Sequence, residues 1–254
     1  MRARPLLILC ALLVGLATGA EAQDREPRRL AADEAEAFRS VGRLDVGGRR
    51  FCSAALVSEV LVVTAAHCLY RPRTHEPVAI GDITFAAGRY GGDEAASRGA
   101  ARVAVPPDYI FDGQPRFERI RRDIVLIELD APIPAEEAPV WPLGPIPAAE
   151  GVVEIVSYAR GRSRRPSLQD GCRIEAVIGP VAALDCGVNL GASGAPIFAV
   201  TKTGRALWGV LSATGTLVGG GEVTLVVRVA PEIDALEAAL EPHVPDRSSE
   251  EEGG

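Results

Sequence analysis

From position 41 onward the chain carries short runs of β-branched and aliphatic residues, and glycine and proline separate these runs. Runs of this length with turn residues between them predict β-strands. The predicted strands cover residues 51–57, 60–64, 82–87, 101–105 and 123–129, and then 152–158, 172–178, 196–200, 206–212 and 223–229. A proline-rich stretch at 139–147 separates the two groups. Because helices do not alternate with the strands, the pattern predicts an all-β sandwich or barrel in two halves.

The clearest helical pattern lies near the C-terminus. Pro231 fits the first turn of a helix, and Ile233, Leu236 and Leu240 fall on one face at helical spacing. We therefore expect a short helix over residues 231–241. The residues after it, 242–254, are acidic and poor in apolar side chains, which predicts a disordered tail.

The first 22 residues have the pattern of an export signal. Two arginines precede the apolar stretch 6–16, and Ala20-Glu21-Ala22 forms a small-x-small cleavage site. The alternative, a transmembrane anchor, needs a longer apolar run. We expect the mature chain to begin near Gln23, to be secreted or periplasmic, and to keep no membrane contact after cleavage. Residues 23–40 are charged and alanine-rich, with a helical turn or two at 33–38, and form an N-terminal arm or a pro-segment.

Composition limits the classes of partner. The chain has 254 residues, of which 47% are hydrophobic, enough for a substantial core. Its formal net charge of −7 argues against a nucleic-acid partner, because nucleic-acid-binding proteins usually present a basic face.

The cysteines predict disulfide bonds. Cys10 lies in the export signal, which leaves Cys52, Cys68, Cys172 and Cys186, an even number in a chain bound for an oxidising compartment. Three pairings are possible, and we favour the two pairs of nearest neighbours. A zinc site is the other use of cysteine, but there is no Cys-x-x-Cys pair and there are only three histidines. We expect neither a metal nor a cofactor.

Three motifs carry candidate catalytic residues. His67, in Thr-Ala-Ala-His-Cys, follows an apolar run, and histidine is the usual general base near neutral pH. Ser193 lies in Gly-Ala-Ser-Gly-Ala-Pro, where small neighbours leave its hydroxyl accessible and Gly191 lets backbone N–H groups converge on an oxyanion. Asp123 opens Asp-Ile-Val-Leu-Ile-Glu-Leu and could orient an imidazole. Taken singly, each has an ordinary structural explanation as a core histidine, a glycine turn or a surface aspartate.

Taken together, and in the order His, Asp, Ser, these motifs resemble the trypsin-like (chymotrypsin-fold) serine proteases. The resemblance covers residues 41–240. It implies two antiparallel six-stranded β-barrels at about 41–140 and 148–230 followed by the short C-terminal helix, with the site between the barrels.

The resemblance also implies roles for single residues. Ser193 would attack a peptide carbonyl of a protein or peptide substrate, His67 would move the proton and Asp123 would orient His67. The N–H groups of Gly191 and Ser193 would bind the oxyanion. The positions that match the family's substrate-binding residues are Gly187, Ser212 and Ala213.

At two positions the chain departs from trypsin itself. Family members that are activated by cleavage hold an aspartate directly before the serine, where it pairs with the freed N-terminal amine, but this chain has Ala192. The aspartate that selects Lys or Arg is replaced by Gly187, and Cys186 lies at a spacing closer to that of bacterial glutamyl endopeptidases. The histidine those relatives use for glutamate is absent near 211–213, and a small or apolar side chain is favoured.

Two other classes of protein fit part of the pattern. A pseudoprotease would keep the fold for binding alone, although all three candidate catalytic residues are present here. A disulfide-bonded β adhesion module would explain the strands and the cysteines but not the three motifs together.

Overall fold

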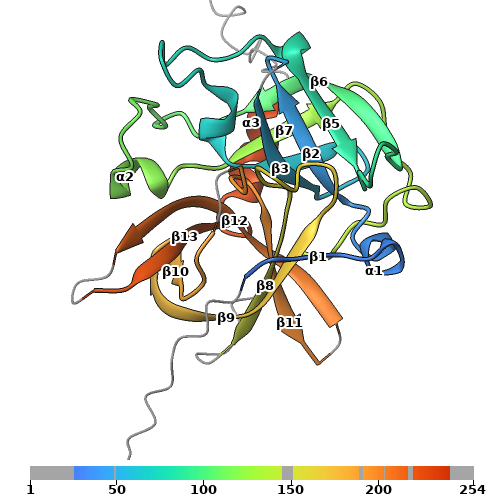
Figure 1. Cartoon of the computed structure of the whole chain (residues 1–254). Coiled ribbons are helices and arrows are strands. Elements are labelled where there is room, and N and C mark those ends of the chain that lie inside the picture. Colours follow the sequence, from blue (N-terminus) through green and yellow to red (C-terminus); the bar gives the residue numbers. More distant parts are fainter. Residues whose placement is uncertain are drawn as a thin grey trace, which may run out of the picture.

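The computed structural model describes residues 26–48, 50–144, 151–188, 191–202, 204–216 and 220–240. The predicted export signal and acidic tail lie outside these residues. The described chain forms two β-barrels, the first built from its blue to green part and the second from its yellow to red part (Figure 1). This is the two-barrel, all-β architecture that the sequence predicts.

The first barrel is closed and antiparallel, with neighbouring strands in the order β2-β3-β4-β7-β6-β5. Its strands are β2 (Val41–Val46), β3 (Arg50–Leu56), β4 (Leu61–Thr64), β5 (Ile83–Ala87), β6 (Ala96–Ala104) and β7 (Val125–Leu129). Its connections hold two 3-10 turns, η1 (Ala66–Leu69) and η2 (Ile80–Asp82), and a one-turn helix, α2 (Phe117–Ile120).

The second barrel has the strand order β9-β10-β13-β12-β11-β8, and pairing of β8 with β9 closes it. Its strands are β8 (Val152–Ser157), β9 (Ser167–Ile178), β10 (Val181–Leu184), β11 (Pro196–Thr201), β12 (Gly204–Thr216) and β13 (Glu222–Arg228). The short strand β1 (Arg28–Arg29) adds to the edge of β9, opposite Ser167 and Leu168.

The predicted strand limits that differ most from the structure are the starts of β9 and β6 and the end of β12, which runs to Thr216 and not to residue 212. Strand β9 begins at Ser167 and not at residue 172, because its first part alternates through buried polar side chains, Ser167 and Gln169, which hydrophobicity does not reveal. Strand β6 begins at Ala96 and not at residue 101, because residues 96–100 contain no β-branched or large apolar side chain that would mark them as a strand. Strand β2, the four-residue β10 and the two-residue β1 are not among the predicted strands.

The N-terminal arm is part of the folded structure. Its helix α1 (Ala32–Glu36) matches the expected helical turn, and Leu30 and Phe38 on either side of it are 2% and 4% exposed. The C-terminal helix α3 (Ile233–Leu240) forms as predicted and buries Ile233, Leu236 and Leu240. No helix in the described part of the chain is long and apolar enough to cross a membrane.

Three apolar clusters determine where a site can form. One cluster fills the first barrel and one fills the second. The third joins them, since it holds Val63 and Leu126 of the first barrel, Val156 and Val210 of the second, and Phe38 of the arm. Apolar side chains from both barrels therefore fill the interface between them. The candidate catalytic residues come from elements on the two sides of this interface.

Candidate active site

The histidine side of the site is built at the end of β4. His67 lies in η1, directly beside Cys68, and the disulfide between Cys52 and Cys68 ties this turn to β3. The second disulfide joins Cys172 to Cys186, so both pairs are the predicted nearest neighbours. His67 and the two cysteines lie close enough together to hold a metal ion, but both sulfurs are engaged in the disulfide and neither is a thiolate ligand.

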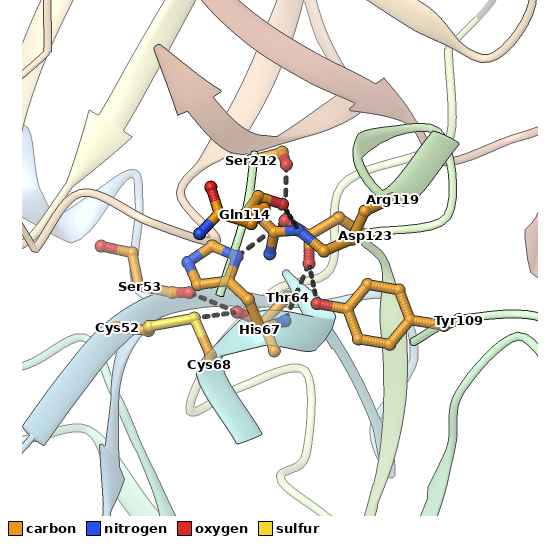
Figure 2. Close-up of polar contacts among 10 residues, drawn as sticks. All are labelled: Cys52, Ser53, Thr64, His67, Cys68, Tyr109, Gln114, Arg119, Asp123 and Ser212. Carbon is orange, nitrogen blue, oxygen red and sulfur yellow. Dashed lines mark hydrogen bonds and ion pairs between the residues drawn. A yellow bond between two sulfur atoms is a disulfide. The ribbon is translucent and has the colours of Figure 1, made fainter. Parts of the chain in front are cut away.

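Asp123 lies two residues before β7, the strand that pairs with β4, and it faces His67. The carboxylate is 1% exposed. Its Oδ2 accepts a hydrogen bond from His67 Nδ1 at 2.7 Å and one from the Ser212 hydroxyl at 2.5 Å, while Oδ1 accepts from the His67 backbone N–H at 2.8 Å (Figure 2). Because Nδ1 is engaged, the second ring nitrogen, Nε2, is the one left for a reacting group. In Figure 2 this nitrogen points away from Asp123.

The charge state of Asp123 follows from these contacts. Burial raises the pKa of its carboxyl. The charge of protonated His67 and the hydrogen bonds from His67 and Ser212 lower the pKa by more than burial raises it, so the pKa lies below its ordinary value. The ionised carboxylate therefore stabilises the fold above the ordinary carboxyl pKa of about 3.9, and this contribution is lost as the pH falls through the lowered pKa.

Tyr109 also belongs to this network, although no sequence motif points to it. Its hydroxyl donates to Asp123 Oδ1 at 3.2 Å (Figure 2). Burial and the Asp123 charge raise the pKa of the phenol, so Tyr109 stays a donor across the physiological range. Tyr109 lies in the loop after β6, where no periodic pattern marks it, and only its approach to Asp123 in space reveals the role.

The serine side of the site comes from the loop before β11. The Ser193 carbonyl accepts a hydrogen bond from the Ser53 N–H of β3 at 2.9 Å, and the Gly194 N–H donates to the Leu211 carbonyl of β12 at 2.7 Å. The loop is therefore fixed to both barrels. Thr64, three residues before His67, lies against it and donates its hydroxyl to the Ser53 carbonyl at 2.8 Å.

Gly194 is the residue that makes this close approach possible. It adopts φ +72°, and a Cβ there would overlap Thr64 Oγ1 and the Ser53 carbonyl. We expect Gly194→Ala to move the loop and to lower kcat/KM by about 100-fold, because small displacements at a reacting centre cost about that much. Kinetics on one peptide substrate would measure the loss. Gly204→Ala, at another positive-φ glycine with nothing near its Cβ position, is the control; equal losses in both would show that strain, and not this contact, is responsible.

The backbone of the serine loop leaves two N–H groups available. Within the described residues, the N–H groups of Gly194 and Ala195 are used in hydrogen bonds, whereas those of Gly191 and Ser193 donate to no acceptor. The Ser193 hydroxyl likewise has no hydrogen bond to His67 or to another described group. The structure thus brings His67 and Asp123 into contact, and it holds the Ser193 loop against Ser53 of β3 and Leu211 of β12. Catalytic hydrogen bonds are often long before substrate binds.

The three predicted substrate-binding residues lie on the second barrel. Ser212 is buried against Asp123, Ala213 follows it on β12 with partial exposure, and Gly187 is exposed after the Cys172–Cys186 loop. Gln169 Nε2 donates to the Gly187 carbonyl at 2.7 Å. Thr224, on the neighbouring strand, is fully buried and donates to the Cys186 carbonyl, so its hydroxyl is already engaged.

Ala192 occupies an apolar environment. It is 1% exposed and belongs to the cluster that fills the second barrel, together with Ala159, Ala195 and Trp208. The position therefore offers no ready surroundings for a carboxylate.

Comparison with known proteins places this geometry in a family. A search of curated protein sequences finds no match. Among solved structures, one described as "Structure of Glu endopeptidase in complex with MPD" superimposes with a TM-score of 0.68 at 17% sequence identity, and the match covers 85% of this chain and 97% of that one. At this identity the likeness concerns the fold. The Trypsin family model matches residues 31–234, which include both barrels, the serine loop and the His67–Asp123 pair. The chain therefore belongs to the trypsin family of serine proteases.

Proposed function

We propose that the protein is a secreted serine endopeptidase that works through an acyl-enzyme intermediate, with His67, Asp123 and Ser193 as its triad. The observation that carries this proposal is the buried Asp123 carboxylate, which accepts a hydrogen bond from Nδ1 of His67. A carboxylate in this place selects the tautomer with a free Nε2 and stabilises the imidazolium that forms when Nε2 takes a proton.

The proposed reaction has two halves. Ser193 Oγ bonds to the peptide carbonyl carbon while its proton passes to His67 Nε2, and the oxyanion is held by the N–H groups of Gly191 and Ser193. His67 then gives the proton to the leaving amine as the C–N bond breaks. In the second half water attacks the acyl ester and loses a proton to His67. His67 then gives that proton to Ser193 Oγ as the C–O bond breaks, which releases the new carboxylate and restores Ser193.

The acyl side of the substrate would lie along β12. Ser212 and Ala213 continue that strand beside Asp123, and Gly187 would border the pocket for the side chain before the scissile bond. No charged side chain is among these positions, which favours a small or apolar residue there. The matched solved structure is described as a Glu endopeptidase, but the histidine expected for glutamate is missing from 211–213 of this chain.

Secretion is part of the proposal. Two disulfides are consistent with an oxidising compartment, and the export signal predicted at residues 1–22 would direct the chain there.

Labelling with a fluorophosphonate tests the proposal. The processed protein is expected to take up one phosphonyl group on Ser193, located by mass spectrometry of its peptides, and Ser193→Ala is expected to take up none. If the folded wild-type protein remains unlabelled, the alternative of a trypsin-fold protein kept for binding would replace the enzyme.

We also expect activity without a freed N-terminus, because Ala192 provides no carboxylate to pair with one. A form extended at its N-terminus should match the processed form in kcat/KM. Ala192→Asp should destabilise the fold by about 3 kcal/mol or more at neutral pH, measured by urea denaturation, because it buries an unpaired charge. Ala192→Asn is the uncharged control of similar size. Strict dependence of wild-type activity on one freed amine would contradict this expectation.

A further inference from the structure

A hollow surrounded by arginines lies at the loop that connects β8 to β9. It has a volume of about 570 Å³, and its lining residues include Arg29, Arg162, Arg164 and Arg165 and no carboxylate. Three of the four arginines come from the loop 159–166, which connects β8 to β9, and the fourth comes from β1, which pairs with β9 next to that loop (Figure 1). We call this hollow the arginine pocket.

The guanidinium groups of the pocket are held in place by neutral partners. Arg29 donates to the Gly161 carbonyl at 3.0 Å, and Arg164 Nε donates to the Gly91 carbonyl at 2.8 Å. Arg165 lies over the Tyr90 ring at 4.8 Å. These contacts position the charges without forming an ion pair. Burial lowers the pKa of Arg162 and the charge of Glu26 raises it, so one carboxylate acts on the pocket from outside its lining.

Elsewhere in the protein arginine is commonly paired with a carboxylate. Arg28, next to Arg29, forms a salt bridge with Glu34, and Arg173 and Arg205 pair with Asp185 and Glu154. In the described part of the chain none of the four pocket arginines forms a salt bridge. Four unpaired cations around one hollow repel one another, and in a protein of net charge −7 this arrangement is a local exception.

The loop that carries the arginines contacts the proposed oxyanion site. A Cβ on Gly191 would lie 3.1 Å from the Arg160 nitrogen, 3.3 Å from Ala159 Cα and 3.4 Å from the Phe51 ring, so the start of the loop and Phe51 border Gly191 directly. Phe51 in turn precedes Cys52, whose disulfide partner is the neighbour of His67.

This placement indicates which part of a substrate would meet the arginines. The acyl half of the peptide would follow β12 past Ser212 and Ala213. If the acyl half lies along β12, the chain beyond the scissile bond would leave on the other side of Ser193, where Phe51 and the start of the 159–166 loop border Gly191. Extended peptide advances about 3.3 Å per residue, so the second and third residues after the scissile bond would extend roughly 7 to 10 Å toward the loop.

We propose that the arginine pocket binds acidic side chains of the substrate on the leaving-group side of the scissile bond. Guanidinium groups form bidentate bonds with carboxylates, and several of them around one hollow raise the local concentration of an acidic segment. The proposal rests on the proposed endopeptidase function and adds a substrate class to it, namely polypeptides with Asp or Glu after the cleavage point.

The test compares two peptides that share the same residues up to the scissile bond and carry either Glu-Glu or Gln-Gln at the second and third positions after it. The wild-type enzyme is expected to cleave the acidic peptide with a higher kcat/KM, and Arg164→Glu/Arg165→Glu is expected to lower the acidic-to-neutral ratio by about tenfold. Arg164→Lys/Arg165→Lys keeps the charge and should keep most of the preference. Arg98→Glu/Arg228→Glu is the matched control, because these two substitutions change the net charge by the same amount. Both arginines lie outside the pocket, where they donate to the Pro132 and Gly179 carbonyls.

Ionic strength gives a readout that requires no variant. The wild-type ratio is expected to fall between about 0.05 M and about 0.5 M salt, because the screening length shortens over that range. A ratio of one in the wild type at low salt would overturn the arginine-pocket proposal while leaving the endopeptidase intact. Absence of all Ser193-dependent cleavage would instead overturn the proposed function. Equal cleavage of both peptides together with Arg164-dependent binding of a sulfated polysaccharide would assign the pocket to a polyanion and overturn the peptide proposal.

Discussion

Replacing Ser193 with alanine is expected to lower kcat by about 10⁶-fold and to leave the fold unchanged, because in the proposed mechanism removal of the nucleophile disables the triad as a unit. The Ser193 side chain forms no hydrogen bond within the described residues, and its loop is held through the backbone contacts to Ser53 and Leu211. Loss of the hydroxyl should therefore stop the reaction without removing a contact that stabilises the fold. Rates on a peptide substrate and the thermal midpoint, measured side by side, check both halves of this expectation.

Two controls accompany that measurement. Ser58→Ala removes a surface hydroxyl that caps the β3–β4 turn and lies outside the site, and it should leave kcat near the wild-type value. His67→Ala should cost about as much as Ser193→Ala, and the double variant should be no worse than either. Residual activity of Ser193→Ala within tenfold of wild type would mean that another nucleophile acts.

Asp123→Asn is expected to lower kcat by about 10⁴-fold. The carboxylate is surrounded by donors from His67, Ser212 and Tyr109, all of which need an acceptor. An amide has only one oxygen. If the NH₂ group of that amide faces His67, Nδ1 must accept the hydrogen bond and the ring proton must sit on Nε2. A protonated Nε2 cannot take the proton from Ser193.

The pH dependence of stability provides an independent check on Asp123. The wild-type protein should lose stability to urea as the pH falls through the lowered pKa of the Asp123 carboxyl, and Asp123→Asn should lack that part of the loss. Asp108→Asn, at an exposed carboxyl that pairs with Arg122, is the control. Identical acid profiles for wild type and Asp123→Asn would show that the buried carboxylate does not contribute as described.

Much of this architecture could be predicted from the sequence because it depends on local pattern. Alternating apolar runs located most strands, and the spacing of Ile233, Leu236 and Leu240 located the last helix. The cysteine pairs followed from proximity in sequence. What escaped prediction depends on contacts between distant segments. The polar start of β9 is stabilised by strands on both sides, which no single-segment pattern shows.

The candidate site divides in the same way. His67, Asp123 and Ser193 stand in motifs that together resemble one family, so they could be proposed from the sequence, and the structure brings His67 and Asp123 into contact. Tyr109 has no motif, and its role appears only when the loop after β6 brings it to Asp123. The arginine pocket needs Arg29 of the arm and the 159–166 loop to meet across strand pairing, a separation of more than a hundred residues along the chain.

Each disulfide closes a loop within one barrel, with its cysteines 16 and 14 positions apart, and within the described residues neither crosses the interface between the barrels. The covalent connection between the two halves of the site is thus the peptide chain alone. A single cut in the segment between β7 and β8 would convert the protein into a two-chain form. Such a form would be held by the shared apolar cluster and by the hydrogen bonds of Ser53 to Tyr158 and Ser193. In such a form the two chains could separate without reduction of a disulfide, and a reducing agent would only destabilise each barrel. Catalytic activity would then measure the noncovalent association of the two barrels.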